Sequence, residues 1–239
     1  MKNLYTYITL FVIAIFTIGC EQETPNNHHV SLIVDRSEED SYAPDTDDVE
    51  TYLTDTSPND GITIGLSYVS DTPYASKYSF VLKPGTTGLL SNEDQRRKQI
   101  RRFHKQFNDS LDYYNNEQEP LRRSDIFRVV VRELDYLSKQ QGERTLLIFS
   151  DLKEHSSLYS VYHPRNRQQI VKNPIKVGDY FNEETQPSKS LEGITVHIIY
   201  EPSIEDTEVF TAMVVIYRNL IEPYGGKLLI GRHTKIEHL

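Results

Sequence analysis

Two aspartates that each follow a short apolar run are the residues of this sequence best suited to chemistry. Asp35 follows residues 30–34 in VSLIVDRSEEDS, and Asp151 follows residues 145–150 in TLLIFSDLKEHSS. Short runs of β-branched and other apolar residues predict buried strands. If the two strands lie side by side in a parallel sheet, both aspartates reach the edge where such sheets bind their ligands. We therefore expect a binding site at these two loops.

Hydrophobic periodicity predicts the elements that position these loops. Alternating apolar and polar residues predict strands, and apolar residues at three- and four-residue spacing predict helices. The sequence accordingly predicts strands at residues 30–34, 61–69, 78–83, 145–150, 194–200 and 227–230, and helices at residues 91–115, 125–141 and 205–221. Only a short loop separates the second strand from the third, so we expect these two strands to form an antiparallel hairpin.

Polar residues near the helix starts predict how the helices begin. Ser91 opens a sequence that resembles a capping box, and Ser124 stands in the N-cap position of the next helix. A short helix near residues 49–53 would take Asp47 or Asp48 as its cap. Each cap would accept hydrogen bonds from backbone N–H groups that have no partner inside the helix.

One α/β domain accounts for almost the whole sequence. We expect a signal peptide at residues 1–19, a tether at residues 20–29, and a domain at residues 30–239. The domain is predicted to be a single doubly wound three-layer αβα unit, with a mostly parallel sheet and one antiparallel edge strand. Residues 152–186 form a long polar excursion beside the candidate site, with a short helix near residues 165–172.

The order of these elements, with DRSEED after the first strand and FSDL after the fourth, resembles the von Willebrand factor type A domain family. The resemblance implies a doubly wound sheet with one antiparallel edge strand. It also implies a divalent cation at the top of the sheet, held by an Asp-x-Ser-x-Ser loop, a threonine before a helix and an aspartate after the fourth strand. Carried over residue by residue, the resemblance assigns the metal site to Asp35, Ser37, Glu39, Ser124 and Asp151.

The chemistry of these residue types agrees with a cation site. Mg²⁺ prefers oxygen ligands, keeps several waters and leaves a position for an outside carboxylate, and Mn²⁺ or Ca²⁺ are the alternatives. Glu39 stands where the family has a serine, and its negative charge should strengthen the hold on a cation. If Glu39 points into solvent, the site is incomplete. The alternative for Asp35 is a structural role, in which it caps its loop or pairs with Arg36 or Arg123.

Composition limits the partners of this chain. It has 239 residues, a formal net charge of −9 and one cysteine, so an internal disulfide is excluded. An acidic surface repels nucleic acid over most of its area, and we expect no nucleic-acid partner. Basic residues gather on the outer face of the helix predicted at residues 91–115. We expect a solvated helix face there, and phosphate or nucleic-acid binding is the alternative.

The first twenty residues, MKNLYTYITLFVIAIFTIGC, have a lysine near the start and a short apolar run before Cys20. A run of this length is typical of a secretory signal rather than of a membrane span. The segment resembles a bacterial lipoprotein signal, in which the cysteine becomes the lipidated first residue of the mature protein. We therefore expect a lipid, including palmitate, on Cys20 and a place on a membrane of the bacterial cell envelope. An ordinary signal or a short uncleaved anchor is the alternative.

Three functions compete at this point. The leading one is an exported, lipid-anchored binding module, not an enzyme, that engages a protein or other acidic ligand through the cation. The second is a Mg²⁺-dependent hydrolase, because phosphatases also place an aspartate at the end of a first strand. Ser37 stands where such an enzyme needs a second acidic residue, and no Gly-x-Ser-x-Gly or phosphate-loop motif occurs. The third is a scaffold protein with a degenerate metal site.

Lipidation can be tested at the single cysteine. Replacing Cys20 by alanine removes the only thiol that could start lipid attachment, so we expect labelling with radioactive palmitate to be lost. Labelling is measured on the protein expressed in a bacterium, with Ser37→Ala as the control. Equal labelling of the Cys20→Ala variant would show that the signal is of another kind.

Overall fold

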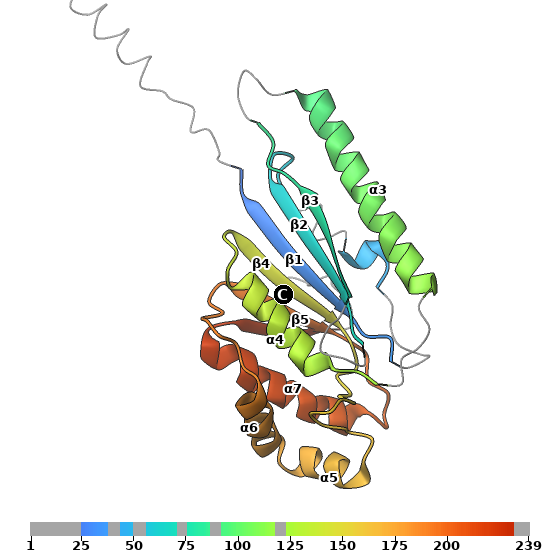
Figure 1. Ribbon diagram of the computed structural model, residues 1–239, viewed down its shortest axis with the longest axis vertical. Helices are drawn as coiled ribbons and strands as arrows, with labels where there is room; N and C mark the ends of the chain where they lie inside the picture. The colour runs from blue at the N-terminus through green and yellow to red at the C-terminus, as the bar shows by residue number, and fades with distance from the viewer. Residues whose placement is uncertain are drawn as a thin grey trace, which may run out of the picture.

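The computed structural model describes residues 25–37, 44–49, 56–70, 76–86, 92–117 and 123–231. Within these residues a six-stranded sheet has the order β3-β2-β1-β4-β5-β6 (Figure 1). The strands are β1 (Asn27–Val34), β2 (Gly61–Tyr68), β3 (Ser76–Leu82), β4 (Glu143–Phe149), β5 (Ile194–Ile199) and β6 (Lys227–Gly231). The helices are α3 (Glu93–Glu117), α4 (Ile126–Leu137), α5 (Pro164–Lys172), α6 (Pro174–Glu184) and α7 (Thr207–Ile221), followed by the short 3₁₀ helix η1 (Glu222–Tyr224).

Strand β1 lies at the centre of the sheet. It pairs in parallel with β2 on one side and with β4 on the other, and Val34 lies opposite both Tyr68 and Phe149. The chain builds β2 and β3 outward on one side of β1 and then returns to build β4, β5 and β6 on the other side. The direction of building therefore reverses between β1 and β4. In open α/β sheets this reversal opens a crevice at the carboxyl ends of the strands.

Helices cover both faces of the sheet (Figure 1). On one face α3 packs over β3 and the strands beside it, with Leu32 and Phe107 fully buried in one apolar cluster. On the other face α4 and α7 pack over the sheet, where Ile33, Phe127 and Tyr217 belong to a second cluster. Successive residues of β1 thus enter different clusters, because side chains of a strand alternate between the two faces. The predicted three-layer α/β fold with one antiparallel edge strand is confirmed, since β3 pairs antiparallel with β2.

The long excursion after β4 contains one helix more than the sequence predicted. The predicted helix at residues 165–172 is present as α5, and a second helix, α6, follows it directly. Pro174 opens α6, and the Asn173 side chain accepts a hydrogen bond from the N–H of Lys176. Proline is well tolerated at a first helical position, so a residue that reads as a loop marker is here a helix start. Both helices pack against α7.

Strand β1 begins earlier than predicted. Its first three residues, 27–29, belong to the predicted tether but pair with β2, and two of them pair with β4 as well. His28 lies between two carboxylates, with Nε2 3.1 Å from Asp60 and Nδ1 3.0 Å from Glu143. These contacts fasten the start of β1 to β2 and β4.

Two helix starts differ from the sequence prediction. The side chain of Asn92 caps α3 by accepting from the N–H of Gln95 at 2.9 Å, and the predicted cap, Ser91, lies outside the described residues. The short helix near residue 49 is described over residues 46–49. Asp45, rather than the predicted Asp47 or Asp48, caps it by accepting from the N–H of Asp48 at 2.9 Å. The Asp48 carboxylate in turn accepts from the N–H of Asp45, which completes a reciprocal pair.

Candidate functional site

The loops after β1 and β4 are joined by an aspartate and a serine. Asp35 extends the β1–β4 ladder by one bond, from its N–H to the carbonyl oxygen of Phe149 at 2.9 Å. The residue is 2% exposed, and its carboxylate accepts from the Ser150 hydroxyl at 2.7 Å and from the N–H of Ser37 at 3.1 Å. The prediction that the two strands are neighbours is therefore correct. Ser150 was not predicted as a site residue, although it stands directly between β4 and Asp151.

A lysine lies between two aspartates beside this contact. The Lys153 ammonium is 3.1 Å from a carboxylate oxygen of Asp151 and 3.1 Å from one of Asp206. Only 9% of the Lys153 side chain is exposed, so this pair of contacts is largely screened from water. The bridge joins the loop after β4 to the residue that precedes α7. The sequence analysis identified neither Lys153 nor Asp206, because nothing in the spacing of residues 153 and 206 relates the two.

Ser124 does not cap the following helix, so that prediction is wrong. Its hydroxyl donates to the carbonyl oxygen of Lys153 at 3.0 Å, and its backbone exchanges two hydrogen bonds with His155. The cap comes from Glu154 instead, whose carboxyl accepts from the N–H groups of Ile126 at 3.1 Å and Phe127 at 3.0 Å. A side chain distant in sequence thus provides the acceptor that helix starts need.

Burial controls the protonation of Glu154. Its side chain is fully buried, which raises the pKa of the carboxyl to about 8, and the buried Asp125 carboxylate raises it further. Hydrogen bonds from Ser156, Phe127 and Ile126 lower the pKa but do not offset burial. One oxygen of Glu154 has no hydrogen-bond partner among the described residues. The carboxyl therefore holds a proton at neutral pH and caps α4 without bringing a full charge into the core.

His155 continues the same loop and makes structural contacts. Its Nδ1 is 2.8 Å from the hydroxyl of Ser160, and its ring lies against the ring of Tyr162. Burial lowers the pKa of the imidazole, and the nearby Arg123 and His163 lower it further. His155 also forms isolated antiparallel bridges with Ser124 and Ser160. The hydrogen bond to Ser160 thus closes a turn of the backbone.

In this arrangement the carboxylate of Asp151 is already paired with a positive charge of the protein. A cation at Asp151 would meet the ammonium of Lys153, which already neutralises that carboxylate. Within the described residues no three His, Cys, Asp or Glu side chains are grouped so that they could hold a metal ion. Glu39, the remaining predicted ligand, lies outside the described residues, as does Cys20. Cation binding therefore stays a prediction.

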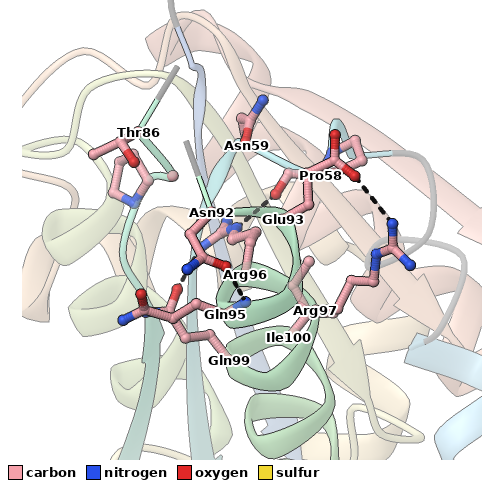
Figure 2. Close-up of a pocket in the computed structure, with 12 residues that line it drawn as sticks. Pro58, Asn59, Thr86, Asn92, Glu93, Gln95, Arg96, Arg97, Gln99 and Ile100 are labelled. Atoms are coloured by element: carbon pink, nitrogen blue, oxygen red, sulfur yellow. Dashed lines mark hydrogen bonds and ion pairs between the residues drawn. The ribbon is translucent and has the colours of Figure 1, made fainter. Parts of the chain in front are cut away.

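A separate hollow of about 770 Å³ lies at the other end of the sheet, beside the start of β2, the end of β3 and the first turns of α3 (Figure 2). Arg96 is the buried cation in its wall, and the guanidinium donates to the carbonyl oxygens of Pro58, Asp60 and Lys83 at 2.6–2.7 Å. Burial lowers the pKa of Arg96. Arg97 pairs with Glu93 at 3.0 Å. Because these guanidinium groups are already bonded to protein oxygens, the hollow is not a ready anion site.

Comparison with known proteins leaves the family open. No protein-family model matches this chain, and no curated protein matches it either. The resemblance to von Willebrand factor type A domains is therefore still a prediction from the sequence. Among the described residues no helix has the length and apolar character needed to cross a membrane.

Glu154 should make stability depend on pH. Its pKa is about 8 in the folded chain and near 4.5 in the unfolded chain, so the folded chain binds more protons between these values. Stability from this group is complete at acidic pH and is lost as pH rises toward 8, at about 1.4 kcal/mol per pH unit. Glu154→Gln should remove this part of the slope in urea unfolding between pH 5 and pH 8. Glu183→Gln, at an exposed position, is the control. A Glu154→Gln slope equal to that of the unsubstituted protein would contradict the assignment.

Lys153 should act as an internal substitute for a metal ion. Lys153→Gln leaves Asp151 and Asp206 without the ammonium that joins them, so the free energy of unfolding should fall by about 3 kcal/mol. Millimolar Mg²⁺ should then raise the melting temperature of this variant, because a bound ligand stabilises the folded state. The unsubstituted protein and Lys172→Gln should not respond. An equal rise in all three proteins would mean that Lys153 does not exclude the cation.

Proposed function

We propose that this chain is a binding module of the bacterial cell envelope that engages a protein partner at the edge where β1 and β4 end. The strand order with antiparallel β3 supports this proposal, because the resemblance to von Willebrand factor type A domains implies such a sheet. The direct contact between Asp35 and Ser150 supports the same edge. The predicted lipid on Cys20 would hold the module at a membrane.

An exposed isoleucine at this edge carries the proposal. Ile204 is 96% exposed in the loop between β5 and α7, two residues before Asp206. Tyr162, which lies against the ring of His155 in the loop before α5, is 49% exposed. Exposed aromatic and apolar side chains can anchor a partner, and such anchors supply most of the binding energy of protein interfaces.

The loop that carries Ile204 is held firmly. The hydroxyl of Ser203 is 3.1 Å from the Asp206 carboxylate, and the N–H of Thr207 donates to the carbonyl oxygen of Ser203. Arg167 of α5 donates to the carbonyl oxygen of Glu205 at 2.9 Å. A side chain presented on a rigid turn loses little freedom on binding, which favours affinity.

Binding is favoured over catalysis by the state of the charged groups. The carboxylate of Asp35 accepts from Ser150, and the carboxylate of Asp151 pairs with Lys153. Both aspartates thus already serve contacts that hold the loops together. A protein partner needs only the shape and the apolar groups of such a surface, with a polar rim around them.

The proposal is tested by placing a charge at the exposed isoleucine. Ile204→Asp should abolish partner binding with little change in melting temperature, because the side chain packs against almost nothing. The matched control is Ile175→Asp on α6, which is 56% exposed. Proteins cross-linked in the envelope of the producing bacterium are compared among the three forms. If a partner cross-links equally to all three forms, Ile204 is not part of the binding surface.

A further inference from the structure

Helix α3 carries a row of exposed basic side chains on its first half. Four basic residues share one side of the helix: Lys98, and the residues three, four and seven positions after it, Arg101, Arg102 and Lys105. All four are exposed. Lys105 pairs with Asp109 at 2.8 Å, whereas the other three make no ion pair or hydrogen bond within the described part of the chain. We call Lys98, Arg101 and Arg102 the basic row.

Helix α3 begins near the point where the chain enters the sheet from its amino terminus, and the basic row follows on the outer side of its next two turns. The N–H of Asn26 donates to the Asp60 carboxylate at 2.7 Å, and Arg96 of α3 donates to the Asp60 carbonyl oxygen at 2.6 Å. Asp60 thus links the start of β1 to the first turn of α3. Figure 1 shows both at the same end of the sheet, opposite the carboxyl ends of β1 and β4. The guanidinium of Arg96 also fixes the helix start through Pro58 and Lys83.

The charge of α3 varies along its length, beginning with Glu93 and Asp94 in the first turn, where Glu93 pairs with Arg97. The basic row lies on the first half, and Asp109 and Asp112 lie exposed on the second half. The chain as a whole carries a formal charge of −9, so the row is a local exception on an acidic protein. A negatively charged surface would attract the basic row and repel the second half of α3. Such an arrangement selects one orientation of the domain.

We infer that the basic row docks the domain on a surface of anionic phospholipids. The predicted lipid on Cys20 is six residues from Asn26, which allows a reach of only about 20 Å. The membrane that holds the lipid is therefore the surface nearest to the start of β1 and to the basic row. Each Lys or Arg beside an anionic bilayer favours the docked state about fivefold, so the three together favour it about 100-fold.

The absence of tryptophan from the sequence allows a direct test. Gln106→Trp places one fluorophore on an exposed position of α3, one turn after Arg102. The full chain is incorporated into vesicles that contain a dansyl lipid, and energy transfer from the tryptophan is measured. We expect transfer to be strong with phosphatidylglycerol present, weak in purely neutral vesicles, and weaker at high salt. The partner protein is not needed, so this test can fail independently of the proposed function.

Charge removal supplies the matched controls. A triple variant should lower the energy transfer in anionic vesicles to the level seen in neutral vesicles. It combines Lys98→Gln, Arg101→Gln and Arg102→Gln. The combination of Arg165→Gln, Lys172→Gln and Lys176→Gln removes three exposed charges from α5 and α6, and it should leave the transfer unchanged. Equal transfer in neutral and anionic vesicles would overturn the inference. It would also be overturned if a DNA oligonucleotide competed with the vesicles for the basic row, because the partner would then be a nucleic acid.

Discussion

The parallel pairing of β1 with β4 is the constraint on which the rest of this structure depends. These two strands are separated by more than a hundred residues, yet their last residues, Val34 and Phe149, are direct partners. That register brings Asp35 level with Ser150 and sets the loops after the two strands side by side. A shift of one residue would exchange the faces of the strand and bury the wrong side chains. Successive apolar side chains of β1 must enter the two opposite apolar clusters, and this requirement sets the register of β1. The same register therefore sets the geometry of the candidate site.

The acidic groups at the ends of β1 and β4 interact mainly with other groups of the protein. Lys153 pairs with two carboxylates in a place that is mostly screened from water, and Glu154 avoids a buried charge by holding its proton. Both arrangements reduce the cost of placing acidic groups near a core. A cation-dependent site needs the opposite, because its carboxylates must be free to bind the ion. Asp35 and Asp151 follow neighbouring strands, and both carboxylates already make contacts within the protein.

The sequence predicted the fold well because the fold depends on local patterns. Strand alternation and helix periodicity are visible in short windows, and the hairpin of β2 and β3 follows from a short connection. The contacts of the site depend on residues far apart in sequence. Ser124 has the right residue type for a helix cap, but Glu154 reaches the same N–H groups from another loop. Lys153 and Asp206 meet only because α7 begins beside the end of β4. Such contacts leave no periodic signal.

The capping of α4 by Glu154 has a mechanical consequence. The loop after β4 and the start of α4 share two hydrogen bonds through one side chain, so neither can move alone without breaking them. Each bond broken in a buried place costs about 1 kcal/mol or more. A ligand that displaced this loop would therefore displace α4 as well. Because α4 is a helix of twelve residues, its far end would move with its start. The carboxyl of Glu154 therefore couples movement of the loop after β4 to movement of α4.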